Sequence, residues 1–318
     1  MIRHALLLTA GLGTRLRPLT DVRAKPAIPV AGEPMIRRII RWLASHGIDD
    51  LVLNLHYRPD TLTAAVGDGS DVGVRARYSW EQPRILGSAG GPRLARPLLG
   101  VDRFWIINGD TLTDVDLAAL AGAHAESGAR VTLALVPNRE FLRYGGVQLD
   151  ANHRVTGFTA RGPSANGSYH YIGVQLADAD VFDAVTPGEP ASSIGGVYDE
   201  LIASHPGSIR GFVSGASFFD VGTAADYMRT SRALMPPADA GAAPSPSVGR
   251  HARIDPTARI TQSILWDDVR VGRDAVLDEC IVTDRVVVPA GAVYRRAILV
   301  RSDTDELVAT PLELGTES

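Results

Sequence analysis

Residues 8–20 read LTAGLGTRLRPLT, and Lys25-Pro26 follows shortly after. Gly11 and Gly13 predict a tight turn whose backbone N–H groups can face an anion. Lys25 is the only lysine among 32 basic residues, so arginine serves wherever a generic positive charge suffices. A lysine kept here indicates a position that needs a compact ammonium rather than a planar guanidinium. We interpret the stretch as a phosphate-binding segment, in preference to a surface lysine kept by chance.

Short apolar runs and amphipathic stretches alternate around this segment up to about residue 234. We expect buried strands at His4–Leu8, Leu51–Leu55, Phe104–Asn108 and Val131–Val136, and helices at Pro34–Ser45 and Asp116–Ser127. This rhythm predicts an α/β domain with a Rossmann-like, mostly parallel sheet flanked by helices. Ligands in such sheets bind beyond the carboxyl ends of the strands, where residues 9–19 and 109–110 fall.

The pattern changes after a Pro-, Ala- and Ser-rich stretch at 235–247, which we interpret as a linker. Over 248–301 apolar residues recur every six positions, with two five-residue steps, which predicts a hexapeptide β-helix of about three coils. An antiparallel sheet is the alternative, but it would show a period of two. The expected domains are thus 1–234, the linker 235–247 and the β-helix 248–301, with a tail at 302–318.

Composition restricts the function classes. A net charge of -4 without a basic run argues against nucleic acid as a partner. No apolar run approaches the ~20 residues of a membrane helix. One cysteine, Cys280, allows no intrachain disulfide and fits a reducing cytoplasm, where it is expected to be a small buried residue. The sequence therefore predicts a cytoplasmic protein that acts on small molecules.

The glycine turn matches neither of two common phosphate loops. Leu16 stands where a dinucleotide fingerprint needs its third glycine, and the Gly-Lys-Ser/Thr ending of a P-loop is missing. With Thr14 to Thr20 and Lys25-Pro26, however, the stretch resembles the nucleotide-binding motif of the sugar-1-phosphate nucleotidyltransferases. These enzymes join a nucleoside triphosphate to a sugar 1-phosphate and release pyrophosphate. The resemblance covers most of 1–234 and resumes after the linker, since GDP-mannose pyrophosphorylases carry a C-terminal left-handed β-helix.

The resemblance implies roles for individual residues. The triphosphate would lie against the glycine turn, and the base against the loop that begins at Glu81-Gln82. The implied nucleotide-binding residues are Ala10, Gly11, Gly13, Thr14, Arg15, Gln82, Gly87 and Ser88. Asp110, after a strand, and Asp220 resemble the two metal-binding aspartates of the family. Arg15, Lys25 and Asp110 are the implied catalytic residues.

The sugar side resembles the family less closely. The turn at Tyr144 resembles a tyrosine-glycine turn that lies beside the sugar, and Arg161 stands where many members have a lysine that meets the sugar phosphate. The acid of that Glu-Lys-Pro segment is absent here. The implied sugar-phosphate residues are Gly146, Arg161, Tyr171 and Gly173. His170, next to Tyr171, is expected to be a hydrogen-bonded structural residue.

These residue types suit the reaction. A sugar phosphate is already anionic at neutral pH, so its attack needs no general base. The reaction needs cancellation of charge between two repelling phosphates and their alignment in line. Mg²⁺ prefers carboxylate, phosphate and water oxygens, so it is the expected cofactor at Asp110 and Asp220. Arg15 is suited to a bidentate grip on the departing pyrophosphate, and Lys25 to cancelling phosphate charge.

Several substrates and one other function class stay open at this stage. The Leu86-Gly87-Ser88 loop and the β-helix favour mannose 1-phosphate with GTP. Other stretches resemble N-acetylmuramate 1-phosphate uridylyltransferases, and hexose or heptose phosphates are further alternatives. A non-catalytic regulatory subunit would lack Lys25 or a metal aspartate, and neither is missing. An acyltransferase role is disfavoured because His251 is the only histidine after the linker, so we expect the β-helix to support a homo-oligomer.

Overall fold

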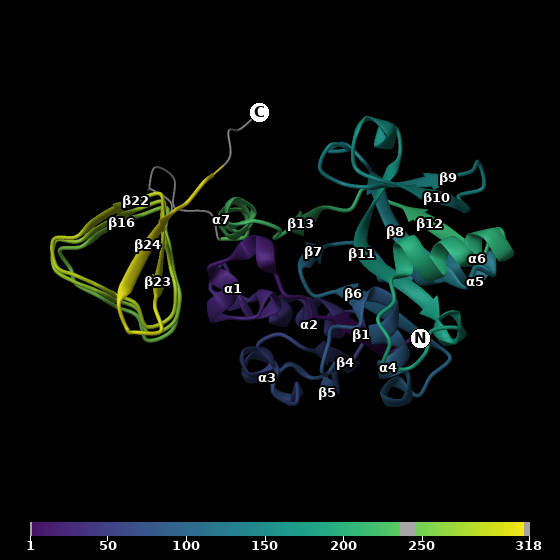
Figure 1. Ribbon diagram of the computed structural model, residues 1–318, viewed down its shortest axis with the longest axis horizontal. Helices are drawn as coiled ribbons and strands as arrows, with labels where there is room; N and C mark the ends of the chain where they lie inside the picture. Colours follow the sequence, from purple (N-terminus) through teal and green to yellow (C-terminus); the bar gives the residue numbers. More distant parts are fainter. Residues whose placement is uncertain (1, 236–245, 315–318) are drawn as a thin grey trace. The chain divides into compact units, whose positions relative to one another are not determined.

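The computed structural model describes residues 2–235 and 246–314, which form two compact units (Figure 1). The first unit comprises Met1–Gly11 and Arg38–Phe219, and the second comprises Leu12–Arg37 and Asp220–Ser318. Most of the expected linker at 235–247 lies outside the described residues. Among the residues that are described, no helix has the length and apolarity required to span a membrane.

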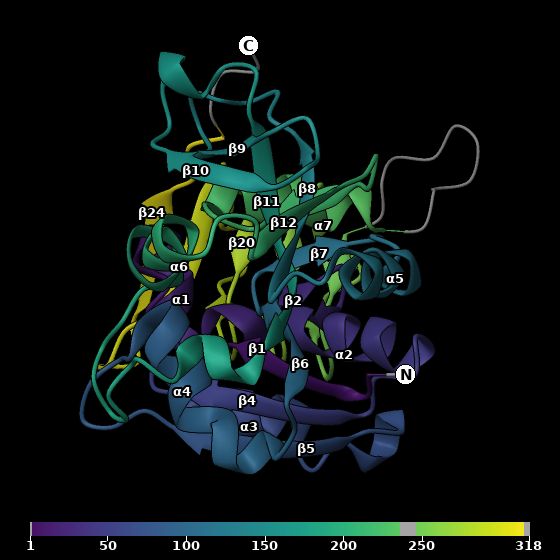
Figure 2. The same ribbon diagram turned by 90° about the vertical axis from the view of Figure 1, so that its right-hand side faces the viewer.

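A nine-stranded mixed sheet forms the centre of the first unit (Figure 2). Seven strands follow the order β10-β9-β11-β6-β1-β4-β5; β8 pairs with β11, and β12 pairs with β8. The sheet strands are β1 His4–Leu8, β4 Asp50–Leu55, β5 Arg75–Trp80, β6 Arg103–Asn108, β8 Val131–Pro137, β9 Gly146–Leu149, β10 Val155–Thr159, β11 Tyr169–Asp178 and β12 Ile209–Val213. The predicted α/β sheet is confirmed, with β1, β4, β5 and β6 parallel and β11 running antiparallel between β6 and β8.

Helices cover the sheet. Helix α4 packs on β1, β4 and β5, whereas α5 packs on β8, β11 and β12. Asp116 caps α5, since its carboxylate accepts a hydrogen bond from the Ala119 amide at 2.9 Å. Other elements of the first unit are β7 Thr111–Thr113, α3 Pro59–Val66, α4 Gly87–Leu99, α5 Leu117–Ser127, α6 Tyr198–Ser204, the short 3-10 helices at Ser70–Val72, Pro163–Ala165 and Ala179–Phe182, and a π-helical segment at Ser193–Val197.

Helix α2, Met35–Ser45, forms where the sequence predicts a helix. Ile36, Ile39, Ile40 and Leu43 are all buried, and their spacing places them on one face of the helix. Arginines at the intervening positions leave the opposite face polar. The helix is therefore held mainly by the burial of this apolar face rather than by the intrinsic propensity of its residues.

Short elements make up the N-terminal part of the second unit. These are the 3-10 helices η1 Thr14–Leu16 and η2 Lys25–Ala27, helix α1 Leu19–Val22, and strands β2 Pro29–Val30 and β3 Glu33–Pro34. Strand β13 Phe218–Asp220 leads to helix α7, Ala224–Ala233. A capping box begins α7, because the side chains of Thr223 and Asp226 each bond the other's backbone amide.

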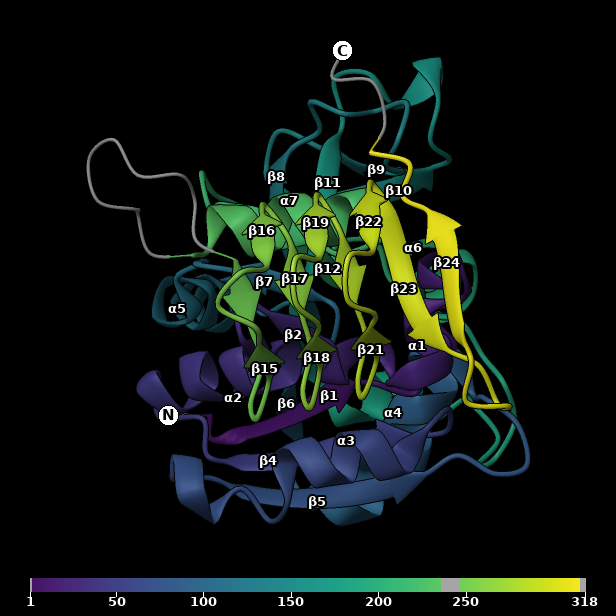
Figure 3. The same cartoon turned by 90° about the vertical axis from the view of Figure 1, so that its left-hand side faces the viewer.

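The C-terminal strands build a β-helix with three faces (Figure 3). Parallel strands stack on one another at a spacing of 17 residues, for example Ile264 beside Ile281. Strand β24 closes one face by pairing antiparallel with β23. The strands are β14 Ser247–Val248, β15 Arg253–Ile254, β16 Arg259–Thr261, β17 Ile264–Leu265, β18 Arg270–Val271, β19 Val276–Asp278, β20 Ile281–Val282, β21 Val287–Val288, β22 Val293–Arg295, β23 Ala297–Arg301 and β24 Leu307–Pro311.

From the second coil onward, residues of the six-residue series such as Val271 and Leu277 are buried in the core of this β-helix. Trp266 is an exception, because Leu265 fills that inward position and the buried Trp266 packs instead against Tyr227 and Arg23. Val248 and Ile254 of the first coil are 41% and 37% exposed, because that coil stacks on only one neighbour. The predicted hexapeptide β-helix is thus confirmed. Because the inward residue is Leu265 rather than Trp266, a coil has two six-residue steps and one five-residue step and takes 17 residues rather than 18.

Candidate functional site

Gly13 of the glycine turn and the single lysine pack directly against each other in the second unit. Gly13 has φ +61°, a left-handed conformation that favours glycine. A Cβ at this position would lie 2.7 Å from Thr20 Cγ2 and 3.2 Å from Lys25 Cβ. The Thr20 hydroxyl donates a hydrogen bond to the Gly13 carbonyl at 3.0 Å. Gly13 is therefore required both for its backbone conformation and for the close approach of Lys25, which is only 8% exposed.

A cation and a carboxylate lie together elsewhere in the same unit. A Cβ built on Gly222 would lie 3.2 Å from Asp220 Oδ2 and 3.5 Å from Arg15 Nη1. Gly222 thus borders the side chains of both residues. Arg15 and Thr14 are exposed in η1, whereas Asp220 is half-buried. Of the sequence-predicted residues, the structure therefore brings Gly13 beside Lys25 and places Arg15 and Asp220 around one glycine.

In the first unit, Ala10 is positioned by a buried hydrogen-bond network. Asn54 Oδ1 accepts from the amides of Thr9 at 2.5 Å and Ala10 at 3.2 Å. Asn54 Nδ2 donates to Glu81 Oε1 at 2.7 Å, and Glu81 Oε2 accepts from the Leu86 amide at 2.7 Å. The network therefore connects the start of the glycine turn to the loop that precedes Gly87. Gly11, which follows Ala10, is exposed, with open space at its Cα.

Glu81 is fully buried. Burial raises its pKa, and the hydrogen bonds from Leu86 and Asn54 oppose that rise. A Cβ on Gly91 would lie 2.7 Å from Glu81 Oε1 and 2.9 Å from Asn54 Nδ2, so helix α4 must present a glycine here. Our sequence analysis missed Asn54 and gave Glu81 no role. The signals were present, namely a polar residue inside an apolar strand and paired glycines in a helix.

The loop at 81–88 rests on a distant segment of the same unit. Gln82 is exposed, and Gly87 has φ +76° at the first residue of α4. A Cβ on Gly87 would lie 2.8 Å from the Ala191 carbonyl oxygen. Ser88 Oγ accepts hydrogen bonds from the amide and the hydroxyl of Ser193, both at 2.9 Å. The Ser88 hydroxyl is therefore engaged in supporting the loop, and Ser193 is a further residue that the sequence analysis missed.

Asp110 follows β6 at the carboxyl end of the strand. Gly173, on the neighbouring strand β11, has φ +77°, and a Cβ there would lie 2.8 Å from Asn108 Cβ. Burial raises the pKa of Tyr171 well above its usual range, and the charges of Tyr198 and Asp110 add to the rise. The buried Tyr171 hydroxyl has no hydrogen-bond partner in the described part of the chain. Asp110, Tyr171 and Gly173 thus form one neighbourhood with an unused polar group.

Gly146 begins β9, and a Cβ there would clash with the side chain of Ser168. Ser168 in turn accepts a hydrogen bond from Asn138 Nδ2 at 3.3 Å and donates one to the Ala165 carbonyl at 2.6 Å. The role of Gly146 in the fold is therefore a close approach of backbone to side chain. Arg161 is exposed after β10.

An aromatic cavity of about 380 Å³ also lies in the first unit. Tyr144 and His170 stack in its lining with ring centroids 4.1 Å apart, and Phe218 lies 5.0 Å from His170. Mainly because of burial, the pKa of His170 falls to about 4, so the ring is neutral at pH 7. His170 and Tyr171 are consecutive in β11 and point to opposite faces of the sheet. The cavity is therefore not formed by the face that carries Tyr171.

Comparison with known proteins places this arrangement in a family. The family model described as "Nucleotidyl transferase" matches residues 4–235. The chain belongs to the nucleotidyl transferase family. A second model, described as "GlmU-like, C-terminal hexapeptide", matches residues 241–295. This nucleotidyltransferase is therefore an enzyme that combines the family's catalytic region with a hexapeptide β-helix, as the resemblance of the glycine turn implied.

Curated relatives of this nucleotidyltransferase have several substrates in their names. It is 32% identical over 302 residues to the mannose-1-phosphate guanylyltransferase of Mycobacterium tuberculosis, covering 92% of this chain and 83% of that protein. It is 32% identical over 231 residues to the D-glycero-alpha-D-manno-heptose 1-phosphate guanylyltransferase of Aneurinibacillus thermoaerophilus, covering 73% and 98%. It is 35% identical over 191 residues to the N-acetylmuramate alpha-1-phosphate uridylyltransferase of Neisseria meningitidis, covering 59% and 80%.

Solved structures agree on the fold. HddC from Yersinia pseudotuberculosis superposes with a TM-score of 0.64 at 21% identity, covering 73% of this chain and all of HddC. A complex of the same protein with GMP-PN gives a TM-score of 0.63. At this identity the likeness concerns the fold alone.

Proposed function

We propose that this nucleotidyltransferase couples a nucleoside triphosphate to a sugar 1-phosphate, with GTP and mannose 1-phosphate as the preferred pair. The observation that carries the proposal is the packing of the single lysine against the glycine turn, with Cβ of Lys25 3.2 Å from a Cβ built on Gly13. This contact brings the base of the lysine side chain beside backbone that is suited to phosphate. Support for the substrate pair comes from the guanylyltransferase relative that aligns over 92% of the chain.

The chain's own groups supply what the reaction needs. The backbone of Ala10, Gly11, Gly13 and Thr14 is proposed to approach the triphosphate. Lys25 would cancel phosphate charge, and the Arg15 guanidinium would hold the departing pyrophosphate. The base is assigned to Gln82, Gly87 and Ser88, which lie in the loop at 81–88. Because the sugar phosphate is already charged, catalysis rests on positioning and charge cancellation rather than on a general base.

Asp110 and Asp220 fit a magnesium ion by their donor chemistry. Both are half-buried carboxylates, and Mg²⁺ is usually bound by one or two carboxylates together with substrate phosphates and water. No cluster of three or more His, Cys, Asp or Glu side chains suited to a metal occurs among the described residues. When bound, the ion would neutralise charge on the α-phosphate. The two aspartates would hold it, and phosphate and water oxygens would supply the other ligands.

The sugar phosphate is assigned to Gly146, Arg161, Tyr171 and Gly173. Tyr171 gives this assignment its structural support, because its buried hydroxyl has no partner among the described residues and lies near enough to Asp110 to feel its charge. A buried hydroxyl without a partner costs free energy, so a substrate oxygen that bonds it would recover that cost. Arg161 is exposed and would take the place of the lysine that many relatives carry.

A screen of substrate pairs tests the proposal. Pyrophosphate release would be measured for five nucleoside triphosphates against mannose, glucose, heptose and N-acetylmuramate 1-phosphates, with Mg²⁺ and with EDTA. We expect the highest kcat/KM for GTP with mannose 1-phosphate. A higher value for UTP with N-acetylmuramate 1-phosphate would move the assignment to that substrate. Release from no pair would refute a sugar 1-phosphate substrate.

Lys25→Ala and Asp110→Ala test the residue assignment. Each is expected to abolish turnover while the unfolding transition stays near that of the wild type. Glu126→Ala is the matched control, since this carboxylate is exposed on α5 away from the assigned residues. Near-normal rates in either of the first two variants would contradict the assignment.

Self-association through the β-helix belongs to the same proposal. The open ends of a β-helix leave backbone groups and apolar side chains without a stacking neighbour, which favours association with a second copy. Light scattering on the full chain would test it. A mass at 33.8 kDa over the whole working concentration range would show a monomer and refute the assembly role.

A further inference from the structure

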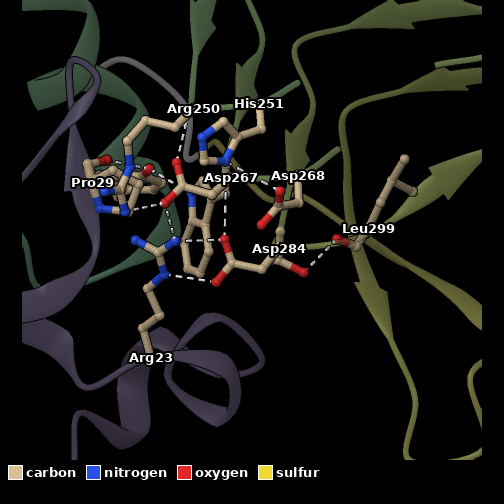
Figure 4. Close-up of polar contacts among 11 residues, drawn as sticks. Arg23, Pro29, Arg250, His251, Asp267, Asp268, Asp284 and Leu299 are labelled. Atoms are coloured by element: carbon tan, nitrogen blue, oxygen red, sulfur yellow. Dashed lines mark hydrogen bonds and ion pairs between the residues drawn. The ribbon is translucent and has the colours of Figure 1, made fainter. Parts of the chain in front are cut away.

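An arginine of the N-terminal segment is held by the β-helix inside the second unit (Figure 4). Arg23 Nε donates to Asp284 Oδ2 at 2.7 Å and Arg23 Nη2 donates to Asp284 Oδ1 at 2.6 Å. Arg23 Nη2 also donates to Asp267 Oδ2 at 2.9 Å. The guanidinium carbon lies 5.4 Å from the ring centroid of Trp266, within range of a cation–π contact. Three side chains of the β-helix thus converge on one arginine.

The contact is buried and charged on both sides. The Arg23 side chain is only 14% exposed, and those of Asp267 and Asp284 are 17% and 21% exposed. Burial acts to lower the pKa of Arg23, but the hydrogen bonds and charges of Asp284 and Asp267 raise it overall. Arg23 therefore stays protonated. A bidentate guanidinium bond of this kind fixes direction as well as distance, unlike an exposed ion pair between flexible side chains.

A second contact fixes the other end of the same stretch. Trp266 Nε1 donates to the Tyr227 hydroxyl at 2.9 Å, and that hydroxyl donates to the Pro29 carbonyl at 2.6 Å. Trp266 and Tyr227 are both completely buried. Residues 23–29, which we call the lysine segment, are thus held at Arg23 by two aspartates and at Pro29 through the Trp266–Tyr227 pair.

Lys25 lies between these two anchors. It is the first residue of η2, and the Ile28 amide bonds its carbonyl at 3.2 Å. Its Cβ is the group that the Gly13 backbone approaches. Because only one residue separates Arg23 from Lys25, a rotation of the backbone at Arg23 would move the lysine relative to the glycine turn. The backbone position of Lys25 therefore depends in part on the contacts that hold Arg23.

We propose that Arg23, Asp267 and Asp284 are positioning residues of the nucleotidyl transfer reaction, through which the β-helix fixes the lysine segment. The inference rests on the proposed function of Lys25. It gives the β-helix a part in catalysis within a single chain, separate from any part in assembly. Removing the carboxylates should lower kcat ten- to a hundredfold, since a misplacement of about 1 Å at a reacting phosphate has an effect of that size.

The test uses full-length variants that keep side-chain shape and remove charge. Asp284→Asn and the double variant Asp267→Asn with Asp284→Asn should lower kcat while KM for the sugar phosphate changes less than twofold. Asp284→Glu keeps the charge and should retain more activity than Asp284→Asn. Asp268→Asn is the matched control, because this neighbouring carboxylate is half exposed and pairs with His251 rather than with Arg23. Should the double variant fail to fold, Asp284→Asn carries the test.

Lys25 itself supplies a readout that does not depend on activity. Because it is the only lysine, biosynthetic labelling with ¹³C,¹⁵N-lysine gives one side-chain signal in NMR. That signal should shift or broaden in Asp284→Asn and stay unchanged in Asp268→Asn. Wild-type kcat together with an unchanged Lys25 signal in both asparagine variants would overturn the inference. If the wild type transferred no nucleotide to any sugar phosphate, the proposed function would fail, and the Lys25 signal would still decide whether the β-helix positions the lysine.

Discussion

Exchanging the chemistry of Asn54 and Glu81 tests whether their buried hydrogen bond connects the start of the glycine turn to the loop at 81–88. Asn54→Asp replaces the Nδ2 donor with oxygen and leaves two carboxylate oxygens about 2.7 Å apart. At an effective dielectric constant of about 20, two unit charges at that separation repel by ~6 kcal/mol. Protonating one carboxyl of ordinary pKa, about 4.3, costs at most about 4 kcal/mol at pH 7. Protonation is the cheaper route, so the variant should take up a proton on folding.

The sign of the pH dependence follows from that proton. Above pH 4.3 the folded Asn54→Asp variant binds one more proton than its unfolded chain, so its stability falls as pH rises. The loss relative to wild type should be about 4 kcal/mol at pH 7 and about 1 kcal/mol at pH 5. Urea unfolding at both pH values measures it. A loss that is equal at pH 5 and pH 7 would contradict the shared proton.

The double variant provides the control. Glu81→Gln alone places its amide donors against either Asn54 Nδ2 or the Leu86 amide, which costs about 1–3 kcal/mol for a buried group left unpaired. With Asn54→Asp added, the new glutamine can donate to the new aspartate and accept from Leu86, while that aspartate still accepts from Thr9. We expect the double variant to be more stable than the sum of the single losses by about 2 kcal/mol or more, and to regain kcat/KM for the nucleotide. Simple additivity in both quantities would refute the network.

Two further outcomes follow from the geometry of the first unit. Gly173→Ala should lower the free energy of unfolding by about 2–4 kcal/mol, because it forces a side chain into positive φ and displaces Asn108. Gly157→Ala has open space around the new methyl group and should change the free energy of unfolding by less than about 0.5 kcal/mol. Urea unfolding measures both, and equal losses would show that the Asn108 contact is unimportant. His170→Phe keeps an aromatic ring against Tyr144 and removes a group whose pKa falls from 6.5 to about 4 on folding. The wild type should therefore lose stability more steeply than the variant as pH falls from 6.5 to 4. If the free energies of unfolding of the two proteins changed in parallel with pH, the buried neutral imidazole would be contradicted.

The sequence predicted the structural features that depend on the spacing of apolar residues along the chain and on where strands end. Strand β1 matches its predicted bounds, and the buried run at 103–108 leads directly to Asp110. The six-residue apolar series predicted the β-helix because every coil must bury its own apolar positions. A residue that follows a strand in a parallel sheet has its place determined by the topology, so the strand pattern placed Asp110 at the edge where ligands bind, whereas its role as a metal ligand was implied only by the resemblance to the family.

The hydrogen-bond partners of polar side chains inside the core could not be predicted from the spacing of apolar residues. Asn54 sits in the strand sequence DLVLNL, where an apolar residue would satisfy the pattern equally well. Its function depends on Thr9, 45 residues away, and on Glu81, 27 residues away. No periodicity records which two polar side chains will meet after folding. The same applies to Ser88 and Ser193, which are 105 residues apart.

The acidic pair of the β-helix shows where a repeat does carry such information. Three residues occupy the same position in successive coils of the β-helix, namely Arg250, Asp267 and Asp284. Parallel stacking of the coils therefore places Arg250 beside Asp267, and Asp267 beside Asp284. The charges of an arginine and a neighbouring aspartate cancel, but two stacked aspartates repel each other, so this pair destabilises the stack unless a cation lies beside it. A half-buried pair of this kind therefore predicts a cation from outside the repeat, and Arg23, 244 and 261 residues away in sequence, supplies it. If that argument is correct, Arg23→Gln should raise the pKa of Asp267, which Arg23 helps to lower in the wild type. An Asp267 carboxylate signal that titrates as in the wild type would show that the pair needs no external cation.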